Sequence, residues 1–79
     1  MNEPYIGEIR MMTARYAPQG WGLCDGQPRN IHDAEGLFNL IGTTYGGDGQ
    51  TTFALPKLEP YHQGVNFFIS FYGAFPAPA

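Results

Sequence analysis

The segment GTTYGGDGQTTFALP, residues 42–56, constrains the fold of this chain more than any other feature. Its glycines at 42, 46, 47 and 49 follow an apolar stretch of helical periodicity, and the segment turns apolar again before a proline. Glycine adopts backbone conformations with positive φ that other residues avoid, so this cluster predicts a sharply shaped loop. Such a loop either holds a ligand or serves only to shape the backbone.

The spacing of the loop fits none of three familiar ligand-binding loops. A phosphate-binding P-loop needs Lys-Ser/Thr after its second glycine, but Asp48 and Gly49 stand at those positions, and a carboxylate repels phosphate. The dinucleotide pattern fails because Thr52 replaces its third glycine. A calcium loop needs several oxygen ligands, and Asp48 is the one acidic residue in the segment. We therefore predict a structural loop, tied by side chains of Asp48 and the neighbouring threonines, with positive φ at one or more of Gly46, Gly47 and Gly49.

The composition disfavours a free-standing monomer. A chain of 79 residues forms one domain that buries only about 60% of its unfolded surface, and a single cysteine cannot form an internal disulfide. Charged residues make up 14% and aromatic residues 15% of the chain, which indicates surfaces buried against partners. The net charge of -3 gives no basic patch for nucleic acid. We expect synthesis in the cytoplasm without a signal peptide, and no membrane insertion, because no stretch reaches about 20 apolar residues.

The periodicity predicts a small α+β fold with a few-stranded sheet. Strands are expected within residues 6–13, 21–24, 51–56 and 65–75, separated by breaks at proline and glycine. Residues 33–41 predict one helix, with Asp33 as its N-cap and Gly42 as its stop. The expected core consists of the apolar residues of these elements: Ile9, Met11, Trp21, Leu23, Leu37, Phe38, Leu40, Ile41, Phe53, Leu55, Phe67, Ile69 and Phe71.

The last predicted strand is apolar on both faces. The odd-numbered residues 65–71 share one face, whereas Phe68 and Tyr72 share the other. A sheet in so small a domain needs only one apolar face. Two explanations remain open: a loop of the same chain covers the second face, or this face meets another subunit. In the second case we expect the contact to use Phe68 or Tyr72 together with the ending Phe75-Pro76.

The remaining reactive side chains form no catalytic set in the sequence. Cys24 has no histidine near it, since His32 and His62 lie far along the chain, and a buried structural thiol is its expected role. A lone His62 could bind zinc only where a symmetry axis brings several copies together. Tyr45 and Tyr61 could stack on sugar rings, because amphipathic aromatic rings suit that contact.

Two segments of the chain, over about residues 3–58, resemble the phage tail collar domain: PYIGEIRMMTARYAPQGWGLCDGQ and LFNLIGTTYGGDGQTTFALPKL. The ending NFFISFYGAFP is similar to the family's closing strand. Family members usually carry a long insert before that strand, with a paired-histidine H-x-H element that holds a metal in trimeric short tail fibres. Here Lys57 leads to Val65 within a few residues and the H-x-H element is absent. The metal site is therefore not carried over, and the insert that builds the receptor-binding head of the family is missing.

The resemblance implies one tail-collar-like domain at residues 3–75, followed by a Pro/Ala tail at 76–79. It implies a non-catalytic structural or adaptor component of a phage tail, tail fibre or contractile injection particle. Such a component is made in the bacterial cytoplasm and resides in a virion tail or an extracellular tail-like particle. The implied partners are copies of itself, as a trimer, and other tail, baseplate or fibre proteins. The alternative is a receptor- or glycan-binding module at a fibre tip, with a host-surface receptor as its partner; no cofactor is expected in either case.

Overall fold

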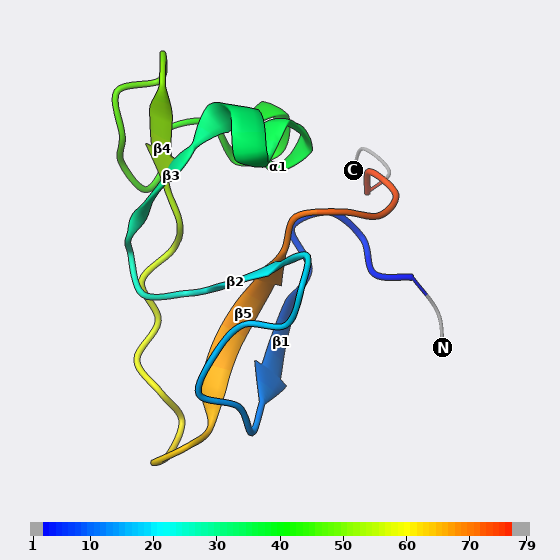
Figure 1. Ribbon diagram of the computed structural model, residues 1–79, viewed down its shortest axis with the longest axis vertical. Coiled ribbons are helices and arrows are strands. Elements are labelled where there is room, and N and C mark those ends of the chain that lie inside the picture. The colour runs from blue at the N-terminus through cyan, green and yellow to red at the C-terminus, as the bar shows by residue number, and fades with distance from the viewer. Residues whose placement is uncertain (1–2, 77–79) are drawn as a thin grey trace.

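The computed structural model describes residues 3–76, which form five short strands, one α-helix and one 3-10 turn (Figure 1). In chain order the elements are β1 Ile9–Met12, β2 Trp21–Leu23, β3 Pro28–Asn30, η1 Ile31–Asp33, α1 Glu35–Ile41, β4 Thr52–Ala54 and β5 Asn66–Ser70. The predicted α+β class is confirmed. Of the predicted Pro/Ala tail at 76–79, residues 77–79 lie outside the described residues.

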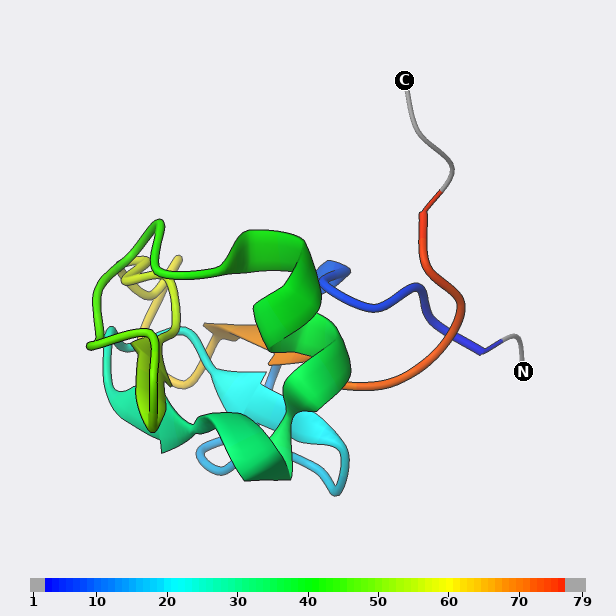
Figure 2. The same cartoon turned by 90° about the horizontal axis from the view of Figure 1, so that it is seen from above.

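Strand β5 is the centre of the fold. It pairs antiparallel with β1 on one side and with β2 on the other, so that Ile9 lies opposite Ile69 and Trp21 lies opposite Ser70. Strands β3 and β4 form a separate antiparallel pair. In Figure 1, α1 lies beside this pair at the upper end of the three-stranded sheet. Figure 2 shows the molecule from above, with α1 toward the viewer.

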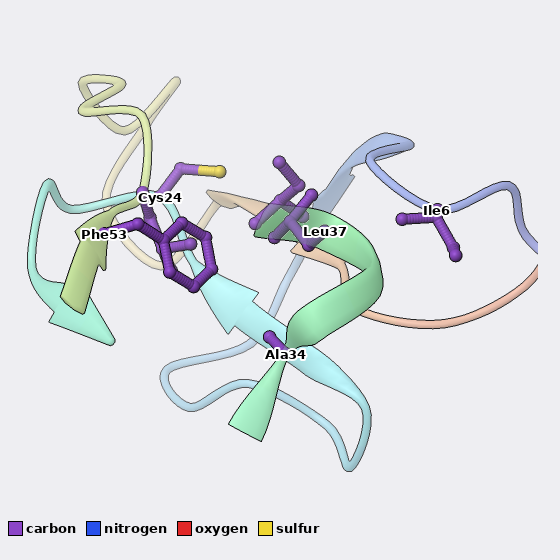
Figure 3. Close-up of a cluster of buried hydrophobic side chains, with 7 residues drawn as sticks. Ile6, Cys24, Ala34, Leu37 and Phe53 are labelled. Carbon is purple, nitrogen blue, oxygen red and sulfur yellow. The ribbon is translucent and has the colours of Figure 1, made fainter. Parts of the chain in front are cut away.

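One hydrophobic core joins the two sheets and α1. It comprises the buried residues Ile6, Cys24, Ala34, Leu37, Phe53, Leu55 and Ile69. In Figure 3, Leu37 of α1 lies between Ile6 on one side and the side chains of Cys24 and Phe53 on the other. The ring of Phe38 packs edge-on against Phe53, with ring centroids 5.6 Å apart. The core therefore draws on segments from the whole chain, which a short helix and three-residue strands need for their stability.

Three residues that the sequence assigned to the core lie at the surface. Ile9, Met11 and Leu40 are 43%, 52% and 41% exposed. Ile9 and Met11 share the core-facing side of the sheet with Ile69, but β1 is one of the two edge strands of that sheet. Alternation along a strand shows which residues share a face and does not show where the cover of that face ends. The prediction was wrong at these positions for that reason.

The helix begins later than predicted and ends where predicted. Asp33 belongs to η1, because the N–H of Ala34 donates to the carbonyl of Ile31 at 3.1 Å and closes a 3-10 turn first. Ala34 is the residue before α1, and no side chain caps the helix, so the Asp33 cap is a wrong prediction. Gly42 has φ 55° and donates its N–H to Phe38 at 2.7 Å, which confirms the predicted stop. Within residues 3–76, no helix is long and apolar enough to cross a membrane.

The ladder of β5 is shorter than the strand predicted at 65–75. Beyond Ser70 the chain turns away, with the Ser70 hydroxyl donating to the carbonyl of Tyr72 at 2.8 Å. Gly73 follows with φ 115°, in a place where a Cβ would collide with the carbonyl of Pro4. The N–H of Ile6 donates to Ala74 at 2.9 Å, so the first and last described segments lie side by side.

The second face of β5 is covered by its own chain. Phe68 and Ser70 have no exposed surface, and the segment 13–20, which crosses β5 in Figure 1, lies against this face. The side-chain amide of Asn66 donates to the carbonyl of Ala14 at 2.9 Å and ties the segment down. Of the two explanations left open by the sequence, the structure supports the first, in which a loop of the same chain covers this face. The expectation that Phe68 contacts another chain is therefore corrected, because it has no surface left to offer.

Candidate functional site

The loop between α1 and β4 is closed by the side chain of Asp48. Its Oδ1 accepts hydrogen bonds from the backbone N–H groups of Gln50, Thr51 and Thr52 at 2.8, 2.9 and 2.9 Å. Its Oδ2 accepts one from the Thr51 hydroxyl at 3.0 Å. The N–H groups of Thr52, Thr51 and Gln50, and then the Thr51 hydroxyl, hold the pKa of Asp48 well below its usual range. The predicted tie is confirmed, and the carboxylate is occupied by its own loop.

The three glycines of this loop all have positive φ, as predicted: 131° at Gly46, 95° at Gly47 and 77° at Gly49. Gly47 is also pressed against β4. A Cβ there would lie 2.7 Å from the carbonyl oxygen of Thr52 and 2.9 Å from the nitrogen of Phe53. Both neighbours are backbone atoms, which cannot swing aside as a side chain can. The loop is thus a shaped piece of backbone that seats β4, and with it the buried Phe53, in the core.

Cys24 is a core thiol. Burial raises its pKa to about 11, with the neighbouring charge of Asp25 adding to the shift. The reactive form of cysteine is the thiolate, so this shielded, protonated sulfur is a poor nucleophile at neutral pH. His32 and His62 are both exposed, and His32 lies 3.4 Å from the carboxylate of Glu35. Within residues 3–76 no group of His, Cys, Asp and Glu has the arrangement of a metal site, and no pocket is present.

The two tyrosines considered for sugar stacking are exposed but lie in different loops. In Figure 1 the loop after α1, which carries Tyr45, is at the upper end of the molecule. The segment 57–64, which carries Tyr61, descends to the lower end. The structure therefore does not bring Tyr45 and Tyr61 together into one stacking surface.

Aromatic side chains remain exposed after β5. Tyr72 is 44% and Phe75 is 54% exposed, and Pro76 is exposed as well. The ring of Tyr72 lies over Gly20, where a Cβ would be 2.8 Å from two ring carbons. Tyr5, which the sequence interpretation did not single out, is also exposed and forms a bridge with Ala74. A lone tyrosine near one end of a sequence gives no sign that the other end folds back beside it.

The sequence was compared with the sequence patterns of known protein families. The sequence pattern of the Phage Tail Collar Domain matches residues 7–61, more than half of the chain. The chain belongs to the phage tail collar domain family. The matched part of this tail collar protein runs from the turn before β1 to the loop after β4 and includes the Asp48 loop. Strand β5, which completes the sheet, follows the matched part.

Membership of this family indicates a structural, non-catalytic role in a tail or fibre and a location in a virion tail. It is consistent with the Asp48 loop being occupied by its own bonds. No curated protein and no solved structure matches the tail collar protein significantly.

Proposed function

We propose that this tail collar protein is a structural or adaptor subunit of a phage tail, tail fibre or contractile injection particle, and that it works without catalysis or a cofactor. The observation that carries the proposal is the closed Asp48 loop, which lies within the residues of the family match. Its carboxylate accepts four hydrogen bonds from its own loop, and Gly47 packs the backbone of the loop against the backbone of β4. A segment built in this way preserves a shape, which is the requirement of a subunit in an assembly.

The subunit contacts its neighbours in the particle through the exposed residues after β5, namely Tyr72, Phe75 and Pro76. These neighbours are copies of the protein, as a trimer, and other tail, baseplate or fibre proteins. Burial of one aromatic side chain contributes roughly 2 to 3 kcal/mol, so a few per subunit offset the entropy lost on association. The low charge content of the chain supports the same conclusion, because few charges would have to be desolvated.

Purified particles from the producing bacterium test the proposal. Mass spectrometry of the particles should find the protein at a constant ratio to the tail proteins, and gold-labelled antibody should mark the tail in electron micrographs. The variant Phe75→Asp should fold normally yet be lost from particles, whereas Tyr16→Asp, at an exposed tyrosine outside the contact, should be retained. Particles that lack the wild-type protein altogether would contradict the proposal.

A receptor- or glycan-binding role is the second candidate, supported by the exposed rings of Tyr45 and Tyr61. Because the two rings lie in separate loops, each would have to bind its ligand independently. A glycan array probed with the purified protein tests this role. Dose-dependent binding that is lost in Tyr45→Ala or Tyr61→Ala would favour it over a purely structural function.

A further inference from the structure

Strand β1 leaves backbone groups unpaired at the edge of the sheet. The N–H of Ser70 donates to the carbonyl of Glu8 at 2.9 Å, and the register continues this pairing through the even-numbered residues of β1. In an antiparallel ladder alternate residues point their N–H and C=O groups away from the partner strand. The backbone groups of Ile9 and Met11 therefore point out of the sheet.

The other edge of the same sheet is closed by local turns. At β2 the N–H of Trp21 donates to Pro18 at 3.0 Å, and the carbonyl of Leu23 accepts from Asp25 at 2.9 Å. No such turn protects Ile9 or Met11 within residues 3–76, and neither proline nor lysine occurs in β1. Exposed strand edges without such protection are templates for pairing with another strand.

The side chains along this edge are apolar on the face that points toward the core. Ile9 and Met11 are the exposed residues of β1 on that face, and Leu40 of α1 continues the strip. A Cβ at Gly7 would lie 2.8 Å from Leu40, so the side chain of Leu40 reaches over the start of β1. Free ladder groups and exposed apolar side chains thus coincide on one edge, which fits an added strand.

The charges on the opposite face of β1 indicate which strand would pair with this edge. Glu8 and Arg10 flank Ile9, with the Arg10 Nε 2.7 Å from Glu8 Oε2. An antiparallel copy of β1 centred on Ile9 would place Glu8 opposite Arg10 of the second copy, and Arg10 opposite its Glu8. Opposite charges directly across two strands stabilise the pairing, whereas centring on Arg10 would set two like charges opposite each other.

We propose that β1 pairs antiparallel with β1 of a second copy of this chain, about a twofold axis at Ile9. The two sheets become one continuous sheet in the order β2-β5-β1-β1-β5-β2. Met11 of each copy then lies beside Gly7 of the other, where the missing side chain leaves Leu40 as its neighbour. The pairing covers the apolar strip and pairs the free backbone groups of Ile9 in both copies, while the N–H of Gly7 stays bonded to the carbonyl of Ser70 in its own chain. It involves none of the residues proposed for contacts in the particle, and it does not depend on that proposed function.

Sedimentation velocity at micromolar concentration tests the association. The wild-type chain should sediment as a dimer or an even-numbered assembly. Ile9→Lys should weaken dimerisation roughly tenfold or more, while its far-ultraviolet circular dichroism stays that of the wild type because Ile9 is already half-exposed. Leu58→Lys is the matched control, since Leu58 is 39% exposed and lies outside β1. A monomeric or strictly trimeric wild-type protein, or equal weakening by both variants, would overturn the proposal.

Disulfide trapping tests the register, in a Cys24→Ser background. Paired residues of an antiparallel ladder have Cα atoms about 5.5 Å apart, within the range of roughly 4.4 to 6.8 Å that a disulfide spans. Ile9→Cys should therefore form a covalent dimer on mild oxidation. Met11→Cys should not, because the two copies of Met11 would be offset by about 13 Å along the strands. Trapping at Met11 but not at Ile9, or at neither, would overturn the axis at Ile9.

Discussion

The two faces of β5 are equally buried but are covered by different kinds of structure. On one face Ile69 packs among side chains from α1 and β4, which are regular elements. On the other face Phe68 and Ser70 lie beneath the segment 13–20, which contains no helix or strand. A few polar ties fix this segment, such as the bond from Asn66 to Ala14. A domain of this size can therefore bury both faces of its central strand with a single helix.

The structures that cover the two faces also differ in the contact that a glycine makes in each. Gly47 brings the loop after α1 against the backbone of β4, and Gly20 brings the segment 13–20 against the ring of Tyr72. One contact is with rigid backbone, and the other is with a side chain that is itself half-exposed. We therefore expect substitution of the glycine on the α1 side to destabilise the fold more than substitution of the glycine in the segment 13–20.

The largest effect is expected from a charge buried beneath the segment 13–20. Phe68→Asp places an unpaired carboxylate at a position with no exposed surface, so it should destabilise the fold by about 4 kcal/mol or more and unfold it. Circular dichroism and binding of a hydrophobic dye would detect unfolding. Tyr72→Asp, on the same face but half-exposed, is the control that should stay folded. A folded but dissociated Phe68→Asp protein would show that this face serves another subunit.

Valine at the two glycines compares the covers directly. Gly47→Val combines a β-branched residue at positive φ with overlap onto backbone, and should cost about 3 kcal/mol or more. Gly20→Val has the same backbone strain, at φ 87°, but the Tyr72 ring can rotate away, so the cost should be about 1–2 kcal/mol. Urea denaturation of both variants gives the two free energies of unfolding. Equal costs would mean that the covers are equally rigid.

Removal of the polar tie should loosen the loop cover alone. Asn66→Ala loses the hydrogen bond to Ala14, which contributes about 1 kcal/mol. Trypsin should then cleave faster after Arg15, which lies in the freed segment. Cleavage after Lys57, outside this segment, is the internal control and should keep its rate. An unchanged rate at Arg15 would show that the segment is held by packing rather than by this bond.

The smallest effect concerns the ion pair on the loop-covered face. The Arg10 guanidinium, and then the N–H of Tyr5, hold the pKa of Glu8 below its usual range. A carboxyl with a lowered folded-state pKa adds stability above its unfolded pKa, about 4.3, and that stability is lost as the pH falls through the folded value. Glu8→Gln should therefore be less stable than wild type at neutral pH, and the difference should shrink at acidic pH. Urea midpoints at both pH values measure it, and a constant difference would contradict the assignment.

The parts of the fold that were predictable are those set by local chemistry. A positive φ follows from glycine itself, and the tie at Asp48 follows from a short acceptor placed two to four residues before free N–H groups. The stop at Gly42 is of the same kind. The non-catalytic nature of the Asp48 loop could therefore be inferred before any coordinates were known.

The parts that could not be predicted depend on contacts between distant segments. Periodicity placed Phe68 on the second face of β5 but could not show that an irregular segment 50 or so residues earlier covers it, because loops carry no period. The same limit applies to Ile9 and Met11, whose exposure follows from β1 lying at the sheet edge. The late start of α1 reflects a 3-10 turn that competes for the same residues, and Asp33 suits either structure.

The closed Asp48 loop also has a consequence for the chemical ageing of the protein. Asp-Gly sequences convert to isoaspartate when the glycine nitrogen attacks the aspartate side chain, and this chain has two of them, at 25–26 and 48–49. In both, the nitrogen is already engaged: Gly49 donates to Thr52 at 2.9 Å and Gly26 donates to Pro56 at 3.2 Å. The side chain of Asp48 is held in addition by its own loop, so it is kept ionised and away from that nitrogen. We expect isoaspartate to form far more slowly in the folded chain than in the unfolded one, which peptide mapping after prolonged incubation would measure. Repair enzymes act inside cells, so the working lifetime of a subunit in a virion tail would then depend on the same bonds that shape the loop.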